Sequence, residues 1–272
     1  MFDDENTFEL LTPSTDLVEV LSAQQEMEAQ LLASSHPAVN MPWASYNWHS
    51  LSREMARFGL ATKGFSIDAP LPEYDVLHML STELSLMSPQ DLKEQFLHIA
   101  EGNPITRLYR ALMETANVRN LLKNENALGW SGFAAMTTDK EAERALRRRR
   151  MVVDHFRDTS DWSSIRALEL SQALGLIWLA LEANMISVAD ALPYEKRCIT
   201  EATVRFGSWN AFAVSLLRAR LFVEAHEESS ELLLTLQKDA ALLEKALKGP
   251  WAKLPWPEFT DGEPTVPVVN RL

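Results

Sequence analysis

Four consecutive arginines, Arg147 to Arg150, are the strongest basic feature of the sequence. Such a run indicates a nucleic-acid or phosphate site when its guanidinium groups face solvent. The neighbouring apolar residues recur at helical spacing, however, which places Arg149 on the apolar face while the other three arginines point away. A desolvated guanidinium is strongly disfavoured without a partner. We therefore expect Arg149 to be buried in an ion pair with an acidic residue of a neighbouring helix.

A second group of ionisable residues lies between positions 224 and 231. It consists of Glu224, His226, Glu227, Glu228 and Glu231. Several carboxylates on one helix face could present ligands to a cation or negative charge to a basic protein. Glu224, Glu228 and Glu231 share a face if the segment from Trp209 to Lys248 is one helix. A solvated acidic surface is the alternative that the same spacing allows.

Other patterns that would carry chemistry are missing from the sequence. The six histidines are scattered, with no pair at i, i+3 or i+4, so we expect no metal ion. The chain contains no glycine-rich nucleotide motif, and Gly129-Trp130-Ser131-Gly132 lacks the five-residue pattern of a nucleophile elbow. Cys198 stands beside Lys196 and Arg197, but burial as a small apolar side chain is the more usual state. We assign no catalytic residue and expect no cofactor.

The chain is acidic, and its charge is unevenly distributed. It has 38 Asp and Glu against 26 Lys and Arg, a formal charge of -12, and no basic residue other than histidine before Arg53. This balance disfavours nucleic acids and anionic membranes and favours a protein partner with a basic surface. The candidate partner-binding residues are Asp3, Asp4, Glu5 and Glu9, or Glu224, Glu227, Glu228 and Glu231.

Helix-start signals recur along the chain. At several places a side chain that can accept hydrogen bonds from first-turn amides is followed by a proline or an acid. These starts are Ser88, Asn103, Thr138, Ser187 and Ser208. Between Leu168 and Leu181 the apolar residues point nearly all round a helix, so we expect that helix at the centre of the core. With nine glycines, and with Leu and Ala far more frequent than Val and Ile, the sequence predicts an all-α fold.

The last part of the chain, residues 250–272, has a different composition. Five prolines exclude a regular helix there, and we expect Trp251 and Trp256 to dock on the chain's own domain. We therefore predict one compact multi-helix domain over residues 1–249, followed by a non-helical tail rich in Pro and Trp. The acidic start lacks a secretory signal, and the longest apolar run is too short to cross a membrane. These features predict a cytoplasmic protein without a membrane partner.

The segment from Leu168 to Arg220 resembles a known bacterial family. The residues that carry the likeness are Leu170-Ser171, Trp178, Ile186, Ser208-Trp209, Phe212 and Arg220. Together they resemble the domain-of-unknown-function family twelve sixty-six, with a family-like core over about residues 43–225. The resemblance implies a compact helical bacterial protein with no assigned activity. It also implies an Asp and an Arg around the start of the apolar helix, where this sequence has Glu169 and Gln172.

These observations favour a non-enzymatic binding protein. Its most concrete form is an immunity protein that binds a cognate bacterial toxin with a basic surface, such as a nuclease delivered by a type VI or contact-dependent secretion system. An enzyme of unfamiliar type is the second hypothesis, with Glu169, His226 and Arg149 as the residues to test first. A regulatory or scaffolding protein that uses its Trp-rich tail is the third. A homo-oligomer is compatible with each hypothesis.

Overall fold

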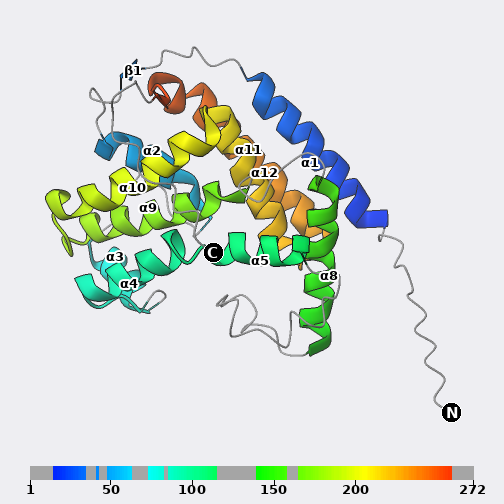
Figure 1. Ribbon diagram of the computed structural model, residues 1–272, viewed down its shortest axis with the longest axis horizontal. Coiled ribbons are helices and arrows are strands. Elements are labelled where there is room, and N and C mark those ends of the chain that lie inside the picture. Colours follow the sequence, from blue (N-terminus) through cyan, green and yellow to red (C-terminus); the bar gives the residue numbers. More distant parts are fainter. Residues whose placement is uncertain are drawn as a thin grey trace.

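Helices form nearly all of the regular structure in the computed structural model, which describes residues 15–34, 41–42, 48–62, 73–82, 85–114, 139–157 and 165–258 (Figure 1). They are α1 (Thr15–Ala33), α2 (Trp48–Ala61), α3 (Glu73–Thr82), α4 (Pro89–Ala100), α5 (Pro104–Glu114), α8 (Asp139–Phe156), α9 (Ala167–Glu182), α10 (Val188–Phe206), α11 (Trp209–Glu224) and α12 (Ser229–Lys248). Two short strands, β1 (Met41–Pro42) and β2 (Pro257–Glu258), pair in parallel. The predicted all-α fold is confirmed.

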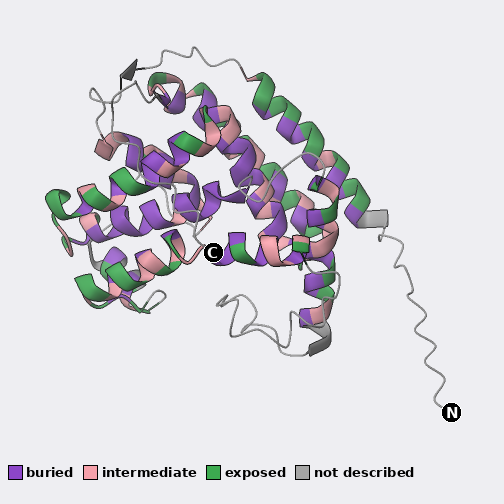
Figure 2. Ribbon diagram, viewed as in Figure 1, coloured by how far each residue is buried: buried purple, intermediate pink, exposed green. Residues whose placement is uncertain are grey.

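Helix α9 is the core helix that the sequence predicts. Its residues from Ala167 to Ala180 are buried with the exception of Gln172 (Figure 2). It packs against α2, α4, α10 and α11, so apolar side chains on every side of α9 find a neighbour. No helix in the described ranges is both long and apolar enough to span a membrane.

Helices α2 and α9 make the closest helix contact, and Ser171 lies at its centre. The Ser171 hydroxyl accepts a hydrogen bond from the Gly59 amide at 2.7 Å and donates one to the Met55 carbonyl at 2.7 Å. Residues 55 and 59 are i and i+4, so the hydroxyl bridges a donor and an acceptor of the α2 backbone. A Cβ added at Gly59 would lie 2.7 Å from the Ser171 carbonyl carbon, so the two backbones meet where only glycine fits.

The predicted helix starts are largely confirmed. Ser88, Ser187 and Ser208 each accept a hydrogen bond from the amide three residues later, and Ser187 forms a complete capping box with Asp190. Thr138 lies outside the described residues. The segment from Trp209 to Lys248 is not one helix, because the chain turns between α11 and α12.

The tail begins with two tryptophans that dock on the domain, as predicted. Trp251 is fully buried and stacks on Trp209 with 4.5 Å between ring centroids. Trp256 is 5% exposed and meets Trp209 edge-on at 5.0 Å. The Trp209 indole also donates a hydrogen bond to the Leu254 carbonyl at 2.7 Å. Residues Trp251–Lys253 form a single 3-10 turn, which the prolines permit because Pro250 precedes the turn instead of interrupting it.

We expect Gly59→Ala to lower the free energy of unfolding by about 3 kcal/mol, because the added methyl group overlaps the backbone of α9 and neither helix can move aside without losing core contacts. Gly175→Ala is the matched control. There the nearest atoms, at 3.3 Å, belong to the Leu60 side chain, which can shift, so the change stays within about 1 kcal/mol. Urea unfolding of both variants measures the difference, and equal losses would contradict the described contact.

Candidate functional site

The carboxylate of Glu169, in the first turn of α9, is the most completely bonded acidic group in the described core. It accepts hydrogen bonds from the amides of Ile105 and Thr106 at 2.7 and 3.2 Å and from the Thr106 hydroxyl at 2.6 Å. Its exposed fraction is 0%. The carboxylate therefore satisfies first-turn amides of α5, at the helix end where the macrodipole favours negative charge.

This contact corrects the predicted cap of α5. The helix begins at Pro104 as expected, but Asn103 adopts a left-handed conformation with φ of 47°, and its side-chain oxygen has no hydrogen-bond partner among the described residues. The cap is supplied from α9, more than sixty positions further along the chain. A local sequence pattern cannot reveal a cap of this kind.

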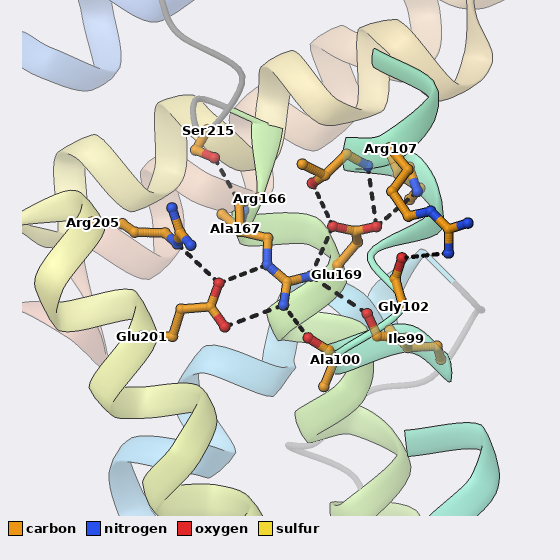
Figure 3. A network of polar contacts seen from close by, with 12 residues as sticks. Ile99, Ala100, Gly102, Arg107, Arg166, Ala167, Glu169, Glu201, Arg205 and Ser215 are labelled. Carbon is orange, nitrogen blue, oxygen red and sulfur yellow. Dashed lines mark hydrogen bonds and ion pairs between the residues drawn. The ribbon is translucent and has the colours of Figure 1, made fainter. Parts of the chain in front are cut away.

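Arg166, directly before α9, completes the arrangement (Figure 3). Its guanidinium donates to the carbonyls of Ile99 and Ala100 at the end of α4 and to the carboxylate of Glu169 at 2.8 Å. It also donates to Glu201 of α10 at 2.8 Å. Positive charge is favoured at a helix C-terminus, so Arg166 complements the end of α4 as Glu169 complements the start of α5. We call Arg166, Glu169 and Glu201 the core ion network.

Within the core ion network, Arg166 and Glu201 hold each other in the ionised state. Burial lowers the pKa of Arg166, but the charges and hydrogen bonds of Glu169 and Glu201 outweigh it and raise the pKa above its usual range. Burial by itself would raise the pKa of Glu201, but the hydrogen bond and charge of Arg166 oppose burial, and the pKa is lowered below its usual value. Arg166 and Glu169 are 1% and 0% exposed, so a substrate in solvent has no access to them. Enclosure of Arg166 and Glu169 favours a structural role for these two residues.

Arg149 is buried, as the helical spacing predicted, with 1% exposure. Its guanidinium donates to the carbonyls of Phe222 and Val223 at 3.2 and 2.8 Å and lies 3.2 Å from the Nδ1 atom of His226. Burial lowers the pKa of Arg149 to about 10, and the charge of Glu224 opposes that shift. Carbonyls at the end of α11 therefore supply close contacts, and Glu224, which the sequence analysis did not name as a partner of Arg149, acts on it through its charge.

Arg148 does not point away from the core, contrary to the helical-wheel prediction. It is 9% exposed and donates to the Ala225 carbonyl at 2.6 Å and to the Ser229 hydroxyl at 3.1 Å. The turn between α11 and α12 brings these acceptors over α8, which the sequence of α8 alone does not show. Arg147 and Arg150 make ion pairs within α8, with Glu143 at 2.6 Å and Asp154 at 2.8 Å. All four arginines are thus engaged in contacts within the chain, with Arg148 and Arg149 buried and the Arg147 side chain 44% exposed.

The acidic group at residues 224–231 is divided by the same turn. Glu224 ends α11, half-buried, and binds Arg220 at 2.5 Å, whereas Glu231 is exposed in the first turn of α12. The shared helix face that we predicted is therefore wrong. Ligand atoms of Glu224, His226 and Glu227 do lie within 4.8 Å of one another. The guanidinium groups of Arg149 and Arg220 beside them oppose the binding of a cation.

The remaining members of the predicted acidic surfaces differ in exposure. Glu228 has a 68% exposed side chain and pairs with Arg144 at 3.0 Å, and Glu227 contacts His226 at 3.1 Å. Such exposed pairs are weak and can exchange partners. Asp3, Asp4, Glu5 and Glu9 lie outside the described residues.

Helix α1, which follows the acidic N-terminal residues, is held by polar contacts on its inner face. Glu28 binds Arg218 of α11 through two hydrogen bonds of 2.8 and 2.6 Å. Gln25 lies 3.1 Å from the Nε2 atom of His155 in α8. Glu19 and Glu26 are exposed, and neither carboxylate forms a hydrogen bond or ion pair within the described part of the chain. Helix α1 therefore presents unneutralised acids to solvent.

Two further ionisable groups complete the picture. Burial raises the pKa of the Cys198 thiol to about 12, so the thiol is unreactive at neutral pH. His49 contacts the buried Glu195 at 3.0 Å, a pairing between α2 and α10 that the sequence reasoning missed because no spacing relates the two positions. Trp48, next to His49, packs against the core.

The comparisons with known proteins identify a family. A family model described as "Protein of unknown function (DUF1266)" matches residues 94–256, more than half of the chain. The family expected from the resemblance is thereby confirmed, over a range that begins within α4 and runs through Trp256. That range contains the whole core ion network, while α1, α2 and α3 lie before it. No curated protein and no solved structure gives a significant match.

Replacing Glu169 with glutamine tests the core ion network. Glu169→Gln removes a buried charge from beside Arg166 and from the start of α5, so we expect a loss of about 3 kcal/mol in the free energy of unfolding. Arg197→Gln, which breaks an exposed pair with Glu101, is the control and costs less than about 1 kcal/mol. Denaturant unfolding monitored by circular dichroism gives both values. A Glu169 variant as stable as the Arg197 variant would show that the network contributes little.

The contact of α1 with His155 predicts a pH dependence. Burial lowers the pKa of His155 below 6.5, and the charges of Glu28 and Arg218 partly cancel. The unfolded chain then binds a proton at His155 more readily than the folded chain does. The stability contributed by neutral His155 is therefore complete above about pH 6.5, and it is lost as the pH falls through the lower pKa of the folded state. We expect unfolding curves between about pH 7.5 and 5 to shift less for His155→Gln than for the parent protein. Identical shifts would exclude His155 as the titrating group.

Proposed function

The chain belongs to the family of proteins of unknown function DUF1266, and from that premise we propose that it is a non-enzymatic acidic binding protein. Its partner is a protein toxin with a basic surface, which it neutralises by direct contact. In this role the chain is an immunity protein. The proposal requires a stable scaffold, surplus negative charge at the surface and no catalytic group.

The observation that carries the proposal is the way the basic side chains are used. Arginines across the described helices form ion pairs with the chain's own acids, among them Arg57, Arg147, Arg150, Arg166, Arg205, Arg218 and Arg220. Basic side chains cannot offset all of the acids, because 38 Asp and Glu stand against 26 Lys and Arg, which leaves a formal charge of -12. Among the described residues, Glu19 and Glu26 of α1 are exposed carboxylates without an ion pair. A surface of this sign attracts cationic proteins and repels nucleic acids.

Toxins that cut nucleic acids carry basic clefts for phosphate, which makes them suitable partners for this surface. Complementary charge accelerates association, and an acidic protein seated over such a cleft excludes the nucleic acid. A nuclease delivered between bacteria by a type VI or contact-dependent secretion system is the specific partner that we propose. A protein that neutralises it acts in the cytoplasm, where the target of the nuclease lies.

The competing functions have weaker support in the same contacts. Of the three residues to test first in an enzyme, Glu169 is enclosed in the core ion network. Arg149 and His226 contact each other at a different place in the structure. The scaffolding hypothesis relied on Trp251 and Trp256, and both are buried against Trp209. The surface carboxylates remain the groups best placed to meet a partner.

Co-expression with the product of the adjacent gene tests the proposal. We expect that product to inhibit growth alone and to be harmless with this protein, and the purified pair to associate more slowly as NaCl is raised from about 0.05 to 0.5 M, because salt screens charge attraction. A catalytically silent mutant toxin serves as the binding partner in the rate measurement. Undiminished growth inhibition on co-expression, or a salt-independent association rate, would contradict the proposal.

A further inference from the structure

Helices α1 and α12 lie side by side at one edge of the molecule (Figure 1). Between them they line an open surface groove of about 320 Å³. The groove is lined by Ala23, Glu26, Met27, Gln30 and Leu31 from α1 and by Gln237, Ala240, Ala241 and Glu244 from α12. The small alanine side chains leave the space, and the two helix backbones form its walls. An open groove of this form suits side chains projecting from another protein better than an enclosed small molecule.

The floor and the walls of the groove differ in chemistry. Ala240 of α12 and Met27 and Leu31 of α1 make the floor apolar, whereas Glu26 and Gln30 make the α1 wall polar. On the α12 wall, Glu244 pairs with Lys248. Glu26 has no such pairing recorded in the described chain, and neither has Glu19, seven residues earlier on the same face of α1. Glu26 thus lines the groove, and Glu19 lies on the same stripe of α1, one turn before the lining residue Ala23. The two carboxylates are two helical turns apart, about 10 Å along the axis.

Charge and shape together select one kind of occupant. Residues 1–52 contain no lysine or arginine, so no basic side chain of α1 can neutralise Glu19 and Glu26. Lys238 and Lys245 of α12 are not among the residues that line the groove, and within the described part of the chain neither forms an ion pair with Glu26. A groove between two helices accommodates a third helix whose apolar residues enter the floor. The acids on the α1 wall require that helix to be basic on one side.

We propose that the α1–α12 groove is the docking site for a basic amphipathic helix of the partner protein. Lysine or arginine side chains seven residues apart on that helix pair with Glu19 and Glu26, and small or medium apolar side chains between them fill the floor. This inference rests on the proposed function and deepens it, because it assigns the contact surface to α1 and α12 instead of to residues 224–231.

A designed peptide tests the groove without knowledge of the natural partner. The probe is a fluorescent helical peptide of about 20 residues, with Lys at two positions seven apart and Ala and Leu on the adjoining face. Its matched control carries Glu at the two Lys positions. We expect anisotropy to show binding of the Lys peptide, at least about tenfold tighter than the Glu peptide at low salt.

Variants of the protein locate the binding site. Glu19→Lys with Glu26→Lys reverses the α1 wall, and Ala241→Trp fills the floor from an exposed position without entering the core. Each is expected to weaken binding of the Lys peptide by about tenfold or more. Glu182→Lys changes an exposed acid at the end of α9 and is expected to leave the affinity unchanged. Circular dichroism confirms that the variants are folded.

The outcomes separate this inference from the function on which it rests. Equal weakening by Glu182→Lys would show general charge attraction and overturn the groove as the site, as would full affinity in the Ala241→Trp variant. Sedimentation that shows a dimer broken by Ala241→Trp would assign the groove to a second copy of the chain and also overturn the inference. If Ala241→Trp still neutralises the toxin, the groove is wrong and the function stands. If the groove binds the peptide but no toxin is neutralised, the function is wrong.

Discussion

The interaction on which the fold depends is the pairing of Arg166 and Glu169 at the start of α9. Two opposite charges three residues apart lie between the end of α4 and the start of α5, and each complements the helix end that it meets. Desolvating two charges is costly, and the cost is offset because their hydrogen bonds also satisfy buried backbone groups at the ends of two other helices. The central helix thereby determines how its neighbours are oriented.

The use of arginines in contacts within the chain also explains why the surface is negatively charged. Many arginines form hydrogen bonds or ion pairs with carbonyls and carboxylates of the same chain. In the run on α8, Arg148 and Arg149 are buried examples. A sequence motif that would indicate phosphate binding on an exposed helix becomes a set of helix-to-helix contacts here. Acidic residues outnumber the arginines and lysines, so the surplus negative charge lies on carboxylates at the surface. The stability of the core and the sign of the surface are two results of one distribution of residues.

The comparison of sequence and structure separates local signals from distant ones. The position of α9 and the caps at Ser88 and Ser187 were predictable because periodicity and capping are encoded within a few residues. The role of Arg166 was missed, although its i, i+3 relation to Glu169 was visible, because its other partners lie on α4 and α10. Arg148 was misplaced for the same reason: a helical wheel assigns a face but does not show which neighbouring carbonyls cover it.

The hydroxyl of Ser171 has a consequence for how the protein opens. Because it bridges the Met55 carbonyl and the Gly59 amide, part of the hydrogen bonding of α2 is completed by an atom of α9. Neither helix can unwind at that point while the other stays intact. Slow exchange of the Gly59 amide with solvent deuterium would then report on separation of the whole helix pair instead of fraying within α2. The two segments, more than a hundred residues apart along the chain, behave as one cooperative unit.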